Sequence, residues 1–441
     1  MRKLATFSIS IAAAAYVAGF ATAPVASAEQ NHLLGLKVRT GVTYTDNRDN
    51  IEEGAIRAGV PQKKQDQYSY YIGPTISLTR QIDDRLDFKA GYSPVIRWYD
   101  EVSKGKEKHK VDHSVFANLD YLLSSKTRIH FSENYWWTGM RDYFYGADYD
   151  YDPNRDTRLD HAYWQNRVSA SVSHKFAGED YAKLTGRWRV KRYDEDELAD
   201  YSDEDEYGAR LDVMHVPSRY VAFGVFGDYM DWDRASDSTK KHGVTIDQGY
   251  TTYTLGLQGI FDFSANRDNY IYAGVGWARG EYEADELDSR DATSVMVELR
   301  LFQLSDTRLL GGLRYMPRYS DAYPFSSQED TAAYLTLTKY VGSDRRLRLN
   351  GSVELRTRRY DLAEDIDPDS YRYGYAEALK AANNGKTKYD KDSFYARLSA
   401  SYKFYEWLDG TLYYSFQKVD SDISSNYKEN VVGVGANVTL Y

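Results

Sequence analysis

The sequence predicts an all-β fold: a closed transmembrane antiparallel β-barrel of about 18 strands, with short periplasmic turns and long extracellular loops. Two patterns support this prediction. Apolar and polar residues alternate with a period of two along most of the chain, and long and short connections between the alternating segments follow one another strictly. The composition agrees, because 42 of the 441 residues are Tyr. Tyr has an apolar ring and a polar tip, so it suits a boundary between hydrocarbon and water.

The composition also excludes several kinds of site. The chain has no Cys, which excludes a disulfide framework, a thiolate zinc site and a cysteine nucleophile. Its net charge of −10 argues against nucleic acid as the main partner, because phosphate binding favours a basic surface. No HExxH, GxSxG or Walker A motif is present, so we expect no enzyme and no organic cofactor.

The N-terminal segment, residues 1–28, has the features of a cleaved secretory signal peptide. Arg2 and Lys3 precede an apolar, Ala-rich stretch, and Ala26-Ser27-Ala28 forms a small-x-small cleavage site. An uncleaved membrane anchor is the alternative. After residue 28 no run of 18 apolar residues occurs, so no transmembrane helix is predicted. We therefore expect residues 29–441 to form a single barrel domain.

The alternation defines the strands. In residues 271–277 one face carries Ile, Ala, Val and Trp, and in residues 346–358 one face is mainly aliphatic while the other is rich in Arg. The predicted strands cover residues 33–45, 67–81, 85–99, 111–124, 127–138, 161–176, 181–193, 207–216, 219–231, 248–263, 269–281, 292–304, 308–319, 331–342, 345–360, 392–405, 410–419 and 428–441. Most exceed the length of about 5–6 residues usual in soluble sheets, as expected of tilted strands that cross a bilayer.

The connections assign the two ends of the barrel. Short ones consist of turn residues, as at 124–126 and 342–344. Long ones cover residues 46–66, 100–110, 139–160, 194–206, 232–247, 282–291, 320–330, 361–391 and 420–427. If both termini lie in the periplasm, every short turn lies there and every long loop lies outside. In the longest loop, residues 370–384 favour a short helix that Gly385 would end.

The polar faces of the strands predict a basic pore lining. The candidate pore-lining cations are Arg97, Arg167, Lys183, Arg187, Arg189, Lys191, Arg314, Arg346, Arg348, Arg356, Arg358 and Arg397. Fewer acids share these faces, among them Glu298 and Glu354. Rings of Arg and Lys favour the passage of anions. The alternative is that these cations pair with acids and stiffen the barrel.

Aromatic residues fall into two predicted groups. Tyr163, Tyr334 and Tyr395 lie on the polar faces beside cations, where a ring can stack on a sugar. Packing against the wall is the competing interpretation for each. The Trp residues are expected in girdles at the membrane interfaces. They are Trp98, Trp136, Trp137, Trp164, Trp188, Trp232, Trp277 and Trp407.

One outer loop carries alternating carboxylates, Asp148, Asp150 and Asp152. Oxygen ligands at this spacing suit Ca²⁺, although Pro153 stands where a calcium-binding EF-hand loop has Gly. A solvated loop extended by charge repulsion is the alternative interpretation.

The signal peptide, the alternation, the sorted loops and the terminal Tyr441 resemble bacterial outer-membrane porins. Thr439 and Asn437 depart from that terminal pattern, where apolar residues are usual. The length and the segment Gly41-Val42-Thr43-Tyr44-Thr45-Asp46-Asn47 look like the putative β-barrel porin type 2 family, whose members are associated with exopolysaccharide secretion. An 18-stranded barrel with an Arg-rich lumen is also similar to the alginate export porin.

This resemblance implies a location in the outer membrane, in contact with its lipid and lipopolysaccharide. It also implies export of an acidic polysaccharide, with periplasmic export components as partners. Two other functions stay open. One is a general or solute-specific diffusion porin for small anionic solutes, and the other is a structural or adhesive barrel with cation-binding acidic loops.

Overall fold

The computed structural model describes most strands and turns of the chain. The described residues are 31–47, 56–57, 60–61, 66–82, 84–100, 108–140, 158–194, 203–234, 249–263, 269–282, 290–304, 306–318, 325–362, 377, 380–381, 384–422 and 426–440. The predicted signal peptide and Tyr441 lie outside them.

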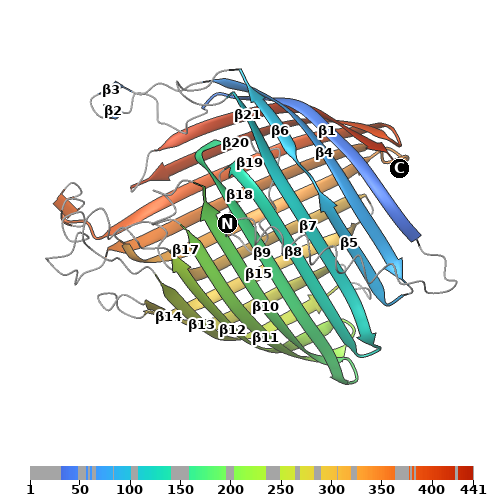
Figure 1. The fold of residues 1–441 in the computed structure, drawn as a ribbon. Helices are drawn as coiled ribbons and strands as arrows, with labels where there is room; N and C mark the ends of the chain where they lie inside the picture. Colours follow the sequence, from blue (N-terminus) through green and yellow to red (C-terminus); the bar gives the residue numbers. More distant parts are fainter. Residues whose placement is uncertain are drawn as a thin grey trace.

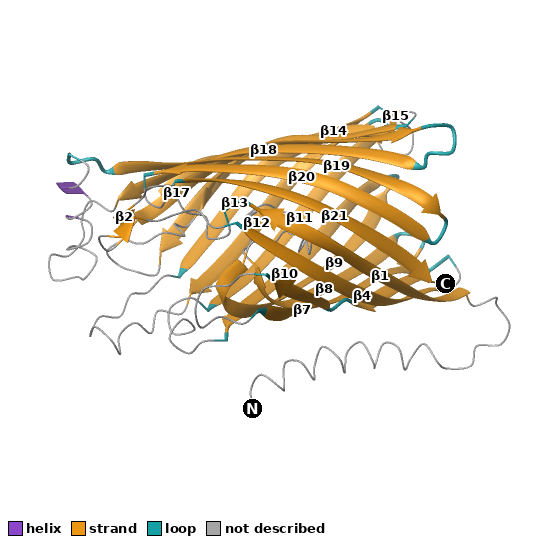
Figure 2. Cartoon of the chain, turned by 90° about the horizontal axis from the view of Figure 1, so that it is seen from above, coloured by secondary structure: helices purple, strands orange, loops and turns teal. Residues whose placement is uncertain are grey.

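One antiparallel sheet winds into a closed barrel (Figures 1 and 2). Its strands are β1 Asn31–Thr45, β4 Gln67–Ile82, β5 Leu86–Tyr92, β6 Val95–Tyr99, β7 His109–Ser124, β8 Thr127–Met140, β9 Arg158–Ala177, β10 Asp180–Tyr193, β11 Glu204–Ser218, β12 Val221–Arg234, β13 Tyr250–Asp262, β14 Asn269–Tyr282, β15 Arg290–Leu304, β16 Thr307–Arg318, β17 Phe325–Val341, β18 Leu347–Leu362, β19 Lys388–Tyr405, β20 Leu408–Ser421 and β21 Tyr427–Leu440. Each strand pairs with the next, and β1 closes the sheet on β21 from Leu36↔Leu440 to Thr45↔Val431.

The closed sheet confirms the predicted fold class and strand count. It contains 19 strands, but β5 and β6 both pair with β4 and β7 and so share one position, which leaves 18 positions around the wall. The predicted span 85–99 is interrupted at Ser93 and Pro94. Proline has no N–H to donate to a neighbouring strand, which explains the break at this point.

The two ends of the barrel differ as predicted. Eight consecutive hairpins turn within a few residues at one end, for example between β9 and β10 or between β17 and β18. The strands that flank the long connections have their other ends together at the opposite end of the barrel. The first residue of β1 pairs with Gln81 beside a short turn, and β21 ends beside the turn at Trp407. Both ends of the barrel chain therefore lie at the short-turn end.

Two small features interrupt the long connections. A hairpin that the sequence did not predict pairs β2 (Ile56–Arg57) with β3 (Val60–Pro61). Within the predicted helix 370–384, Glu377, Lys380 and Ala381 are helical. The Gly385 N–H donates to the Lys380 carbonyl at 2.7 Å, and Gly385 has φ +80°, so it ends the helix as predicted. Among the described residues no helix is long and apolar enough to span a membrane.

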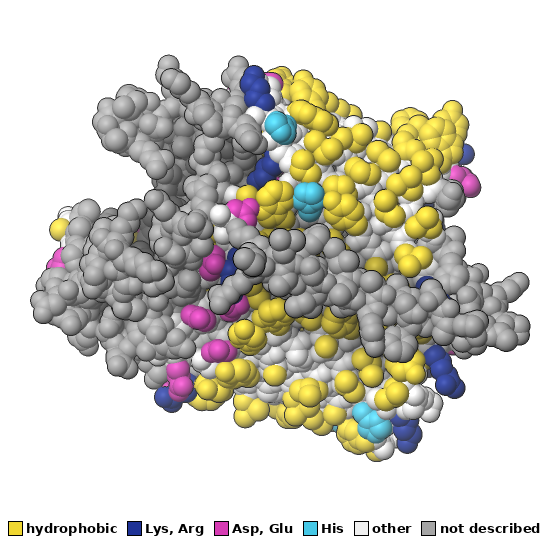
Figure 3. Space-filling model, viewed as in Figure 1, with side chains coloured by type: hydrophobic (Ala, Val, Ile, Leu, Met, Phe, Trp, Pro, Cys, Tyr) yellow, Lys and Arg dark blue, Asp and Glu magenta, His cyan; other side chains and the backbone are white. Residues whose placement is uncertain are grey.

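The outer wall is apolar, and large side chains on it are exposed. Leu255 and Leu398 are 65% and 64% exposed, which would be costly in water and is stable in hydrocarbon. Figure 3 shows hydrophobic side chains over much of one outer face, with acidic side chains gathered mostly toward the long-loop end. Trp98, Trp277 and Trp407 are exposed on this wall, as expected of girdle residues. The girdle prediction is wrong for Trp136 and Trp232, which are buried on the inner side.

Candidate functional site

The inner wall of the barrel is the candidate site, because alternation brings the polar faces of successive strands together there. The predicted cations lie on this face, with the exception of Arg346. That residue lies in the turn before β18, where Gly342 and Arg345 have positive φ, and it pairs with Asp344 at 2.9 Å. The strand starts two residues later than predicted, so Arg346 projects from the rim.

Toward the long-loop end the inner cations are neutralised by buried carboxylates. Arg97 on β6 pairs with Asp112 on β7 at 3.4 Å, and both side chains are fully buried. Asp112 also accepts a hydrogen bond from the Thr138 hydroxyl at 2.7 Å. The Arg97 guanidinium lies over the Tyr71 ring, 5.5 Å from its centroid. This network joins β4, β6, β7 and β8 across the wall.

A second cluster joins three strands through one buried acid, Asp330 on β17. Arg356 on β18 donates from Nε to Asp330 at 2.8 Å, and its second nitrogen also contacts that carboxylate. Arg314 on β16 lies 3.5 Å from the same carboxylate, which is fully buried. Arg358 faces Asp330 in the strand register. The acid at the centre lies just outside the predicted strand 331–342, so the alternation does not reveal it.

A third cluster lies on β10 to β13. Arg189 pairs with Glu204 at 3.2 Å and Glu206 at 3.0 Å, and Arg187 pairs with Asp228. Arg210, which is not among the predicted cations, pairs with Asp212 at 2.9 Å and lies 3.7 Å from Asp228. Gln258 completes the cluster by accepting from Arg210 and donating to Asp212. Only the register between strands brings these residues together, and the period-two pattern of one strand does not reveal it.

The inner tyrosines lie against the wall, and several cover a glycine. Tyr334 donates to Glu298 at 3.2 Å, and a Cβ on Gly312 would lie 2.6 Å from its ring. A Cβ on Gly433 would overlap the Tyr413 ring, whose centroid is 4.5 Å from the Arg397 guanidinium carbon. Each ring therefore needs a neighbour without a side chain.

The other two candidate tyrosines also belong to the wall. Tyr163 is 1% exposed, packs on Tyr193 at 5.7 Å and lies under the Lys191 ammonium at 4.4 Å. Tyr395 lies between Glu354 and Gln417 in the register.

Cations toward the short-turn end have different surroundings. Arg348, the second residue of β18, donates only to the Ser401 hydroxyl at 3.5 Å. Arg39 on β1 donates to the Ser93 hydroxyl at 3.2 Å. Lys183 is exposed near the start of β10. Arg167, by contrast, faces Arg189 in the register toward the long-loop end, and its guanidinium lies over the Trp136 ring at 5.1 Å. Among the described residues, Arg39 and Arg348 thus contact hydroxyls, whereas the cations of the three clusters contact carboxylates.

The predicted calcium ligands, Asp148, Asp150 and Asp152, lie outside the described residues. Among the residues that the structure does describe, no group of three or more His or acidic side chains is arranged to hold a metal ion.

Comparison with known proteins gives structural likeness alone. No protein-family model matches the chain, and no curated protein matches it. Among solved structures, OccAB2 of Acinetobacter baumannii is 11% identical over 93% of this chain and 98% of its own, with a TM-score of 0.47. OpdQ of Pseudomonas aeruginosa is 10% identical over 93% and 98%, with a TM-score of 0.43. The siderophore receptor PirA of Pseudomonas aeruginosa is 7% identical over 92% and 80%, with a TM-score of 0.42.

The architecture rests on this chain's own sheet. Its strands pair continuously around the wall, its outer face is apolar and its inner face is polar. The chain therefore folds as a closed transmembrane antiparallel β-barrel, as predicted.

Proposed function

We propose that this barrel is an outer-membrane channel for a hydrophilic, anionic substrate, and that its substrate is an acidic exopolysaccharide leaving the cell. The observation that carries the proposal is a group of inner cations near the short-turn end. They are Arg39, Arg348 and Lys37, which lies two residues before Arg39 on β1 and opposite Thr439 of β21. None of the three forms an ion pair with a carboxylate of the described residues. Their charge is thus available to an anion in the lumen.

The surroundings of these cations suit a carboxylate-bearing sugar. Arg39 and Arg348 both act electrostatically on Lys37, and Asp409 is the acid that opposes them there. Hydroxyl pairs lie beside two of the cations: Ser93 next to Arg39 contacts Thr75 at 2.7 Å, and Ser401 next to Arg348 contacts Thr411 at 3.0 Å. Cations bind carboxylates, while hydroxyls exchange hydrogen bonds with sugar hydroxyls.

The width of the barrel is consistent with passage of a polymer. Barrels of 16–18 strands enclose an aqueous channel, whereas eight-stranded barrels are filled by their own side chains. The ion pairs toward the other end hold neighbouring strands together and leave fewer net charges there. Attraction for an anion is then strongest at the end facing the periplasm, where an exported polymer would enter.

Single-channel recording in planar bilayers tests this proposal. We expect an acidic oligosaccharide of uronic acids to interrupt the current when added at the short-turn side, and a neutral oligosaccharide of equal length to interrupt it much less. Arg348→Glu should reduce the interruptions several-fold. Arg346→Glu is the matched control, because Arg346 lies in the short turn before β18, outside the lumen, and its charge should affect the interruptions little.

The competing functions correspond to other outcomes of this experiment. Conductance with interruptions only by small anions would indicate a diffusion porin for anionic solutes. No conductance under any condition would indicate a structural or adhesive barrel and would overturn the channel proposal.

A further inference from the structure

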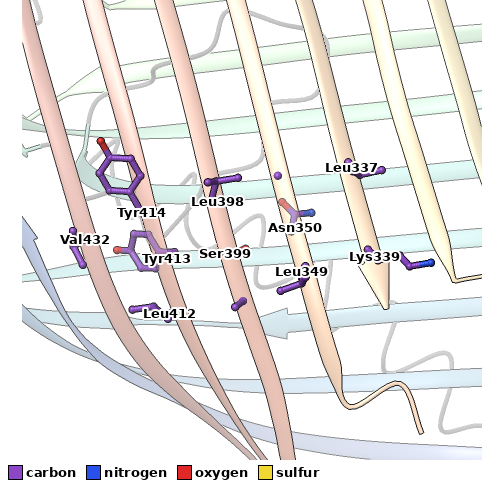
Figure 4. Close-up of a pocket in the computed structure, with 12 residues that line it drawn as sticks. Leu337, Lys339, Leu349, Asn350, Leu398, Ser399, Leu412, Tyr413, Tyr414 and Val432 are labelled. Carbon is purple, nitrogen blue, oxygen red and sulfur yellow. The ribbon is translucent and has the colours of Figure 1, made fainter. Parts of the chain in front are cut away.

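A groove runs along the outer wall of the barrel where β17 to β21 present their lipid-facing side chains (Figure 4). Its volume is about 570 Å³. Leu337, Leu349, Leu398, Leu412 and Val432 line it, all of them well exposed. The groove is therefore on the hydrocarbon side of the wall, separate from the lumen in which we place the substrate.

Two small residues create the hollow. Gly351 lies between Leu337 and Leu398 in the register, and Ala400 lies between Leu349 and Leu412. Four leucines thus stand as ridges beside two positions with little or no side chain. A hollow of this kind in an apolar surface loses van der Waals contacts unless an apolar group from another molecule fills it.

The groove has a cation at one end. Lys339 lines it, and its ammonium donates to the Thr307 hydroxyl at 3.2 Å. Lys339 lies two residues before the end of β17, at the short-turn end of the barrel. The hairpin of β19 and β20 also carries exposed aromatic side chains at its short turn, where Tyr405 and Trp407 stack at 5.4 Å. Such aromatic girdles lie at the headgroups of a membrane.

We propose that this groove is a binding site for one anionic glycerophospholipid of the periplasmic leaflet. One acyl chain lies in the hollow over Gly351 and Ala400, and the lipid phosphate pairs with Lys339. The position of Lys339 selects the leaflet, because the outer leaflet meets the opposite end of the barrel. No carboxylate lines the groove, so a second copy of the chain would bring no partner for the ammonium.

Native mass spectrometry of the full chain, extracted from bilayers of equal parts phosphatidylglycerol and phosphatidylcholine, tests the site. We expect one retained lipid per barrel, with phosphatidylglycerol favoured roughly twofold to fivefold, the range of a single exposed ion pair. Lys339→Gln should keep the lipid and lose this preference. Gly351→Leu and Ala400→Leu should each reduce retention of both lipids.

Gly259→Leu is the matched control. Gly259 faces outward on β13, and a Cβ there would meet only the Ala222 carbonyl at 3.7 Å, so retention should match that of the native chain. Heat-dependent migration on gels checks that each variant is folded. Unchanged retention in both groove-filling variants, or an unchanged preference in Lys339→Gln, would overturn the proposal. A dimer that only the groove-filling variants disrupt would instead make the groove a contact between copies.

Discussion

Tyr413 and Gly433 show how a single residue without a side chain shapes the inner wall. The Tyr413 ring occupies the space of the missing Cβ, and its hydroxyl lies 3.0 Å from the Thr43 hydroxyl. We expect Gly433→Ala to destabilise the barrel by about 1–3 kcal/mol, the usual cost of overpacking. Gly186→Ala is the control, since its Cβ would approach no atom closer than 4.0 Å.

The unfolding temperature of reconstituted barrels measures this effect. The double variant Tyr413→Ala, Gly433→Ala should lower the unfolding temperature by less than the sum of the two single variants. The reason is that without the Tyr413 ring the overlap with a Cβ at position 433 is gone. Additive costs would contradict the proposed contact between ring and glycine.

Asp180 at the short-turn end makes the stability of one hairpin pH-dependent. The Val216 backbone N–H donates to its carboxylate at 2.7 Å, and His215 Nδ1 lies 2.9 Å away. The backbone hydrogen bond and then His215 hold the pKa of the Asp180 carboxyl below its usual value. A lowered pKa contributes stability at pH values above about 4 that is lost as the pH falls through the folded value.

Asp180→Asn should therefore unfold at a lower temperature than the native chain at pH 7, and the difference should narrow toward pH 3. Asp84→Asn, in another short turn, is the control, because Asp84 makes no polar contact in the described structure. A difference that stays constant from pH 7 to pH 3 would contradict the role of the Asp180 charge.

At the scale of elements, Asp330 holds β16, β17 and β18 together through two arginines. Asp330→Asn would leave Arg314 and Arg356 with insufficient buried negative charge, and breaking such a group costs about 3–5 kcal/mol. The exposed pair of Arg346 and Asp344 provides the comparison, and Asp344→Asn should cost less than about 1 kcal/mol. The free energy of unfolding in urea measures both effects. Equal decreases for Asp330→Asn and Asp344→Asn would show that the buried cluster stabilises the barrel no more than the exposed pair does.

The elements themselves follow largely from the alternation, because one face must meet hydrocarbon and the other can be polar. The failures have local causes. Pro94 divides a strand that the pattern joins, and the turn at Gly342 delays the next strand past Arg346. Trp136 and Trp137 are adjacent, so they point to opposite faces and cannot both belong to a girdle.

At the scale of the whole molecule, the sequence predicts which side chains face the lumen but not which of them pair. Pairing depends on register and shear, which set Arg187 beside Asp228 and Arg356 beside Asp330 although 41 and 26 residues separate them. The two interpretations of the basic wall, a path for anions and a set of stiffening ion pairs, therefore each apply to a different part of it.

Cations with and without a carboxylate partner should therefore respond differently to substitution. Arg348→Gln removes a cation without a carboxylate partner, so it should lower anion selectivity and leave stability nearly unchanged. Arg356→Gln removes a buried, paired cation, so it should lower stability more than selectivity. Ion selectivity in bilayers and unfolding temperature, measured on both variants, check this contrast. The reverse pattern would contradict the assignment of the two regions.

The zero-current potential of the native barrel in a planar bilayer, under a KCl gradient, tests the central claim most directly. A lumen with available basic side chains should give a potential whose sign shows that chloride passes faster than potassium. The magnitude of this potential should decrease at high salt, because the ions screen the inner charges. A potential near zero or of the opposite sign would contradict an anion-conducting lumen.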